Sequence, residues 1–169
     1  MFTSDGLLQL HTWTNYSLDR LFGHCAQFTD EELTREFEGF GFSRLLAQLA
    51  HIVLCEQFWV CMLSGQPPVT ELPERPTFAW LEEVRPRILA RTRDYLSRMD
   101  DATLNTEATL HFEDGFKETA TPAYYMNHVL THCFHHKGQA AAMCRLLGKP
   151  FAQDMDLLYK AEWPEAKEG

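Results

Sequence analysis

The sequence predicts an all-α protein, a four-helix bundle whose long third connection carries a small β-hairpin. Four long segments repeat apolar residues with the helical period, and capping or stop residues mark their ends. The helical pattern lapses only between residues 99 and 122, where turn residues and short alternating segments appear. With 169 residues, 45% of them hydrophobic, the chain has room for one well-buried core, so we expect a single domain over residues 1–169.

The first helix is expected to begin near Ser4 or Asp5, either of which can cap the free backbone N–H groups. Its apolar side carries Leu7, Leu10, Thr14, Leu18 and Leu21, with Trp13 beside it. A short helix should follow at Thr29, because Thr29 and Glu32 have the spacing of a capping box.

The second long helix is predicted over about residues 43–64, after a loop that contains Gly39 and Gly41. Ser43 is the expected cap, and Gly65 marks the end. Its broad apolar face consists of Leu46, Leu49, Ala50, Val53, Leu54, Phe58 and Cys61.

The third helix is predicted over Thr77–Met99. Pro86 lies inside this segment and lacks a backbone donor, so we expect either a kink there or a later start. The last long helix should begin at Thr121, with Pro122 at its first position, and end at Gly148.

The hairpin is predicted between these two helices. Its strands are Thr109–Phe112 and Phe116–Thr119, and Asp114 and Gly115 form the turn. Because two short strands are marginally stable alone, the hairpin should lean on the helices.

Charge and polarity argue against a nucleic-acid or membrane partner. The 24 acidic residues outnumber 15 basic ones, which gives a net charge of -9, and no basic cluster offsets it. The most apolar helix carries five polar residues that a bilayer span would not tolerate, namely Arg44, Gln48, His51, Glu56 and Gln57. The N-terminus also lacks the basic and apolar regions of a signal peptide.

The five cysteines are odd in number and form no CxxC pair. This usage is typical of a reducing compartment, so we expect a cytoplasmic protein.

Four of the eight histidines fall within nine residues, and His132 and His136 are four apart. On a helix this spacing places two imidazoles on one face, where they can bind Zn²⁺, Ni²⁺ or a similar ion. His51 is the best candidate for a third ligand, because it lies mid-helix on the predicted buried side of the second helix.

Each observation alone has a simpler explanation, since single interior histidines are usually core residues and HxxxH pairs occur on many surface helices. Together, on helices that pack in one bundle, they predict a divalent-metal site. His128, one turn before His132, and Cys55, one turn after His51, remain additional candidate ligands. Glu56 is expected to form a salt bridge or a cap rather than act as a base, because it points about 140° away from His51.

Other metal and hydrolase signatures are absent. No histidine has a glutamate three residues before it, as di-iron bundles do, and HExxH is missing. Gly-x-Ser-x-Gly is missing too, which leaves a hydrolase-like activity with little support. The mid-helix Gly138 predicts close approach by another helix, and Gln139 could reach an imidazole or a substrate.

The run from His132 to Gln139, HCFHHKGQ, resembles the H-x-x-H-H-R-G-Q signature of the DinB/YfiT-like family. Supporting matches are Trp13-Thr14-Asn15, the second-helix pattern of His51, Glu56 and Trp59, and the closing segment 154–158. Lys137 stands where the family usually has arginine, and Thr131 where asparagine is frequent.

The resemblance implies a four-helix bundle that binds a divalent metal through His51, His132 and His136, usually as a homodimer. It also implies a metal-dependent enzyme, with thiol S-transferases and isomerases that use bacillithiol, mycothiol or glutathione among the relatives. The alternative is a non-enzymatic, stress-associated dimer in which the ion is structural. Three protein ligands leave a coordination position for water, a thiol or a small-molecule substrate.

Overall fold

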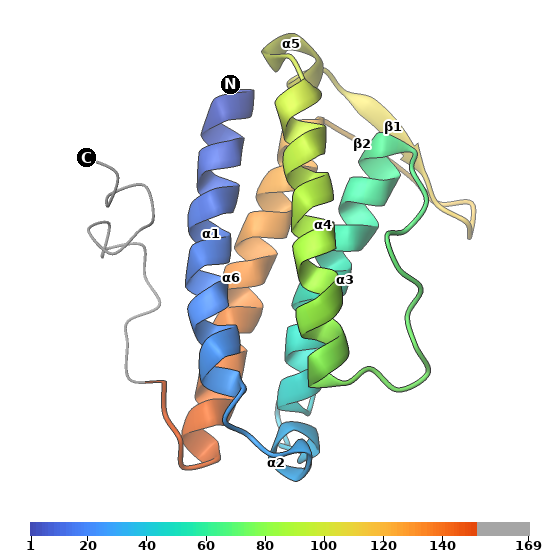
Figure 1. The fold of residues 1–169 in the computed structure, drawn as a ribbon. Coiled ribbons are helices and arrows are strands. Elements are labelled where there is room, and N and C mark those ends of the chain that lie inside the picture. Colours follow the sequence, from blue (N-terminus) through green and yellow to red (C-terminus); the bar gives the residue numbers. More distant parts are fainter. Residues whose placement is uncertain (152–169) are drawn as a thin grey trace, which may run out of the picture.

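In the computed structural model, which describes residues 1–151, four long helices lie alongside one another (Figure 1). They are α1 (Ser4–Cys25), α3 (Leu45–Ser64), α4 (Phe78–Arg98) and α6 (Pro122–Leu146). A small antiparallel sheet lies in the connection between α4 and α6. The predicted fold class is confirmed.

Two short helices join the long ones. The helix α2 (Asp30–Thr34) begins with the predicted capping box, in which Thr29 and Glu32 bond each other's backbone N–H. The helix α5 (Asp101–Leu104), capped by Asp100, was not predicted, because four residues are too few to show a helical period.

Helix α1 begins at Ser4, as expected, but its cap lies one residue earlier than predicted. Its cap is Thr3, whose hydroxyl accepts from the Gly6 N–H at 3.1 Å, so neither Ser4 nor Asp5 is the cap. Ser4 instead donates its hydroxyl hydrogen to the Leu96 carbonyl and thereby joins α1 to α4.

Ser43 does not cap α3, which is also a departure from the sequence prediction. The helix begins at Leu45, and its flanking residue Arg44 makes no side-chain cap. The chain is held here by an antiparallel bridge between Glu36 and Arg44 and by the Phe37 N–H, which donates to the Ser43 carbonyl at 2.7 Å. Tertiary contacts therefore replace the local cap.

Helix α4 begins at Phe78, with Thr77 as its cap, and runs through Pro86. A later start is thus wrong. Pro86 and Glu82, whose carbonyl is left without a donor by the proline, are both exposed to solvent, where water can satisfy that carbonyl.

Helix α6 has both predicted ends. Thr121 caps it and Pro122 is its first residue. At its other end Gly148 adopts φ 77°, and the N–H groups of Gly148 and Lys149 bond the carbonyls of Arg145 and Cys144. This is a Schellman motif, which requires the left-handed conformation that glycine adopts without strain.

The hairpin consists of β1 (Ala108–His111) and β2 (Lys117–Ala120). Phe112 and Phe116 lie outside the strands and close a three-residue loop: the Phe112 N–H donates to the Phe116 carbonyl, and the Gly115 N–H to the Phe112 carbonyl. Gly115 has φ 86°, as the bulge position of such a loop requires.

Helix α3 packs against α4 and α6, and α1 packs against the same two helices. By length and composition α3 could cross a membrane, but half of its most apolar stretch is buried inside the bundle, which fits the core helix of a soluble protein. Phe58, predicted in the buried face, is 46% exposed and stacks on Phe112 of the hairpin.

Candidate metal centre

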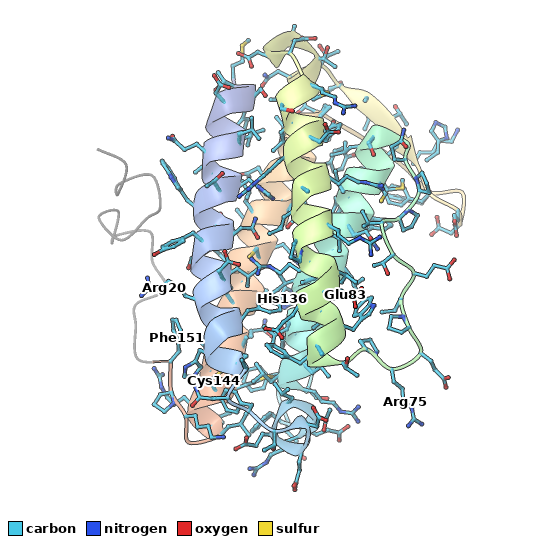
Figure 2. The ribbon with its side chains drawn as sticks, in the orientation of Figure 1. Arg20, Arg75, Glu83, His136, Cys144 and Phe151 are labelled. Carbon is cyan, nitrogen blue, oxygen red and sulfur yellow. The ribbon has the colours of Figure 1, made fainter. Side chains whose placement is uncertain are left out.

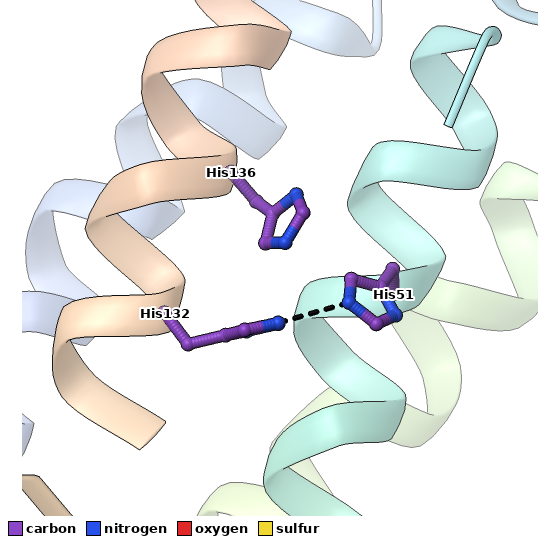
Figure 3. A group of neighbouring side chains, drawn as sticks. All are labelled: His51, His132 and His136. Carbon is purple, nitrogen blue, oxygen red and sulfur yellow. Dashed lines mark hydrogen bonds between the residues drawn. The ribbon is translucent and has the colours of Figure 1, made fainter. Parts of the chain in front are cut away.

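Helices α3 and α6 bring three imidazoles together in the bundle (Figure 3). One ring nitrogen from each of His51, His132 and His136 lies within 4.8 Å of the others. The Nε2 atoms of His132 and His51 are 2.9 Å apart, although 81 residues separate them in the sequence. The structure thus places the three predicted residues in one cluster.

The geometry follows from helical spacing and packing. His132 and His136 are one turn apart on α6, and their ring centroids are 4.3 Å apart. The His51 ring, from α3, is 4.6 Å from each of them. His136 is buried, whereas His51 and His132 are half-buried, so the cluster has one side toward the bundle interior and another toward its surface.

The protonated nitrogen of His136 is defined by Gln48. The Gln48 amide NH₂ donates to the Phe42 carbonyl at 2.9 Å and to Gln139 Oε1 at 2.6 Å. Since a carbonyl only accepts, the Gln48 oxygen must face His136, and it lies 2.7 Å from Nδ1. Nδ1 therefore carries the hydrogen, and the lone pair on Nε2 is free for a metal ion.

Burial keeps all three imidazoles neutral. Loss of solvation lowers the pKa of His132 to about 4 and that of His136 to about 4, and the neighbouring imidazoles add to both effects. Burial also lowers the pKa of His51. Neutral imidazole is the form that binds metal ions, so the lowered pKa values keep the three rings in the required protonation state at neutral pH.

Phe42 covers His51 from the loop before α3. Its ring stacks on the imidazole with centroids 4.0 Å apart and an interplanar angle of 29°. The backbone carbonyl of the same residue accepts from Gln48. A single loop residue thus contacts one histidine directly and supports another through the glutamine.

The donor set fits a divalent ion of the zinc type. Tetrahedral coordination at about 2.0–2.1 Å requires ligand nitrogens roughly 3.3 Å apart. The observed separations, from 2.9 Å between His51 and His132 to a maximum of 4.8 Å within the group, bracket this value. Small side-chain rotations would bring the three nitrogens around a shared ion, and three ligands leave a further position open.

The additional candidates lie outside this group. The His128 ring packs edge-on against Trp59, 5.5 Å between centroids, and next to His132. Cys55 is half-buried, and burial raises the pKa of its thiol to about 11, which disfavours the thiolate that binds metals. Neither belongs to the cluster of His51, His132 and His136 in the described part of the chain.

Gln139 contacts an imidazole, as expected. Its Nε2 lies 2.7 Å from the His135 ring, outside the cluster, and its Oε1 accepts from Gln48. Gly138 is exposed, and a Cβ there would meet nothing within 4 Å, so the predicted close approach of another helix is wrong.

Glu56 is buried and accepts from His11 Nε2 at 2.8 Å and from Thr92 at 2.7 Å. It joins three helices, as the salt-bridge interpretation expected.

Gln48 and Phe42 are the residues near the cluster that the sequence analysis did not assign to it. Gln48 had a usable signal: it lies one turn before His51 on the same helix face, as a buried amide in an apolar segment. The position of Phe42 depends on the loop, which no local pattern defines.

Comparison with known proteins agrees with this architecture. The solved structure of a conserved protein from Enterococcus faecalis is similar, with a TM-score of 0.65, 16% identity, and coverage of 83% of this chain and 96% of that one. A DinB-like protein from Bacillus cereus ATCC 10987 gives a TM-score of 0.62 and 21% identity, over 89% of this chain and 98% of that one. No curated protein matches the chain.

The sequence model of the DinB family matches residues 1–168. The family's closing segment at 154–158 lies outside the described residues. His132 and His136 lie in the run that resembles H-x-x-H-H-R-G-Q, and His51 lies in the second-helix pattern, on the expected helices of a four-helix bundle. From the match over nearly its whole length, this chain belongs to the DinB family.

Proposed function

We propose that this protein is a divalent-metal enzyme that transfers a low-molecular-weight thiol to an electrophilic carbon. The observation that carries the proposal is the convergence of His51, His132 and His136 on one point with neutral rings. Three histidines with a position left open are typical of catalytic rather than structural zinc sites. The choice of a thiol substrate comes from the resemblance to the DinB superfamily.

A divalent ion bound there would supply positive charge that favours a thiolate over a thiol at neutral pH. In the transfer, the thiol sulfur forms a bond to carbon, the leaving group departs with its bonding electrons, and the thiol proton passes to solvent. Gln48 holds the His136 ring in the metal-binding tautomer. Phe42 shields one face of His51 from water.

Turnover of 1-chloro-2,4-dinitrobenzene tests the activity. The protein is assayed with glutathione, bacillithiol and mycothiol, after chelation and after loading with Zn²⁺ or Ni²⁺. We expect chloride release that depends on metal with at least one thiol and that is lost in His132→Ala. His111→Ala, on the exposed hairpin, is the matched control and should keep full activity. If none of the thiols gives a metal-dependent rate, the transferase function is wrong.

The second candidate is a non-enzymatic dimer in which the ion is structural. The origin of the ligands on α3 and α6 favours it, because an ion held by both helices would cross-link the bundle. A structural ion predicts a sharp fall in melting temperature on chelation with no turnover. A catalytic ion predicts turnover and a smaller change in melting temperature.

We also propose a cytoplasmic homodimer. The family resemblance supports the dimer, and the cysteine usage supports the compartment. The exposed aromatic rings of Phe58, Phe116 and Tyr124 offer apolar surface for a second copy. Light scattering of the purified protein should give twice the chain mass, and a monomer at micromolar concentration would contradict the dimer.

A further inference from the structure

A pocket of 660 Å³ adjoins the metal centre, and His51 forms part of its wall. This volume lies within the range of small-molecule sites in proteins. The pocket is bounded by α3, by the loop before it and by the connection between α3 and α4. Of the three clustered histidines, His51 lines the pocket, together with exposed residues such as Leu72 and Arg75.

The inner surface of the pocket is apolar. Helix α3 supplies Leu46, Ala47, Ala50 and Leu54, which share one side of the helix next to His51. Leu72 and Pro76 face them from the connection. Ala47 and Ala50 are the small members of this wall, and a larger side chain at either position would occupy the space.

Charged groups are confined to the rim. Arg44, Glu74 and Arg75 are all exposed. Glu36 binds Arg44 at 2.6 Å, and Arg75 projects from the connection between α3 and α4 (Figure 2). Apart from these charged groups, the polar side chains that line the pocket are those of Thr34 and His51, and Phe42 stacks on His51.

We infer that this pocket binds the uncharged alkyl or aryl part of the molecule whose polar end is held at the metal centre. The inference rests on the proposed metal site and concerns the electrophilic substrate, since the thiols proposed above are polar. Ala47 lines the pocket from α3, and Phe42 lines it next to His51, on which its ring stacks. A short, fully polar substrate would leave this surface exposed to water, without the stabilisation that burial of apolar groups provides.

A series of straight-chain hydroxamic acids, from acetohydroxamic to hexanohydroxamic acid, tests the inference by calorimetry on zinc-loaded protein. The hydroxamate end binds zinc, and only the alkyl length varies. We expect affinity to rise about fourfold for each methylene that the pocket buries. Ala47→Phe should bind acetohydroxamic acid normally and lose the rise with length. Ala90→Phe, an exposed position on α4, should keep it.

The result that overturns the inference is an affinity independent of chain length, or a rise that persists in Ala47→Phe. If Ala47→Phe does not fold, Leu72→Ala replaces it, since Leu72 is 60% exposed in a connection and its truncation should reduce the increment per methylene. Zinc content measured beforehand separates the two proposals. Protein that binds no zinc contradicts the metal site, whereas zinc-loaded protein with a flat series contradicts the pocket alone.

Discussion

The side-chain oxygen of Gln48 lies 2.7 Å from Nδ1 of His136 and fixes which nitrogen of that ring carries the hydrogen. Gln48→Met keeps the size of the side chain but removes this acceptor. We expect metal affinity to fall about 10- to 100-fold, as it does when the partner of a metal-binding histidine is lost. Competition with a chromophoric chelator measures it. Gln66→Met, on the exposed connection, is the control and should leave metal affinity unchanged. Wild-type metal affinity in Gln48→Met would show that Gln48 does not orient His136.

Each histidine of the cluster should be required for stoichiometric metal binding. We expect about one equivalent of zinc or nickel in the wild type and a large loss in His51→Ala, His132→Ala or His136→Ala. His128→Ala and Cys55→Ala should retain the ion, because both residues lie outside the group. Elemental analysis of protein prepared without a nickel column gives the stoichiometry. Full occupancy in His132→Ala would contradict the site.

Replacement of Glu56 separates a structural role from a catalytic one. Glu56→Ala leaves two buried donors, His11 Nε2 and the Thr92 hydroxyl, without their acceptor. We expect the free energy of unfolding to fall by about 2–4 kcal/mol, with unchanged metal content. Urea denaturation checks this, with the exposed Glu113→Ala as the control. A variant of unaltered stability that lost turnover would instead identify Glu56 as a catalytic group.

The contact between Glu32 and Lys149 should make stability depend on pH. Lys149 Nζ lies 2.7 Å from both Glu32 oxygens, and this bond, with the Thr29 backbone N–H, holds the pKa of the carboxyl below its ordinary value of 4.5. Because the unfolded chain binds this proton first, the stabilisation is complete above pH 4.5 and is lost as the pH falls through the folded-state pKa.

Lys149→Met should therefore be less stable than the wild type at pH 7, and the difference should shrink in acid. Urea denaturation at several pH values measures the difference, and NMR titration should show a raised pKa of Glu32 in the variant. Lys117→Met, on the exposed face of β2, is the control. A difference that stays constant below pH 4.5 would contradict the contact.

Local patterns predicted most of the fold. The capping box at Thr29, the proline at the start of α6 and the glycine after its end are each signals within a few residues, and all three are present in the structure. The error at Ser43 came where a backbone bridge stands in place of a side-chain cap. Arg44 stands at the cap position of α3 and pairs with Glu36 in an antiparallel bridge. Ser43 lies one residue before that position and does not cap the helix.

For the candidate site, local patterns predicted the three histidines but not the residues that support them. Their spacing on α6 places His132 and His136 on one face, and the apolar period of α3 places His51 on its buried side. The sequence therefore predicted all three candidate ligands. The partners of Gln48 could not be chosen, because they come from α6 and from the loop before α3. Likewise, nothing near Glu56 in the sequence indicates His11 or Thr92.

Phe42 makes the loop between α2 and α3 a working part of the centre. Its ring lies on His51, and its carbonyl orients the amide that orients His136, so both helices that carry the histidines depend on one backbone position. A ligand that displaces the Phe42 ring would also move the Phe42 carbonyl, which accepts from Gln48. Ligand binding in the pocket and metal binding at the histidines are therefore coupled. A ligand in the pocket should change the affinity for the ion, and the ion should change the affinity for that ligand.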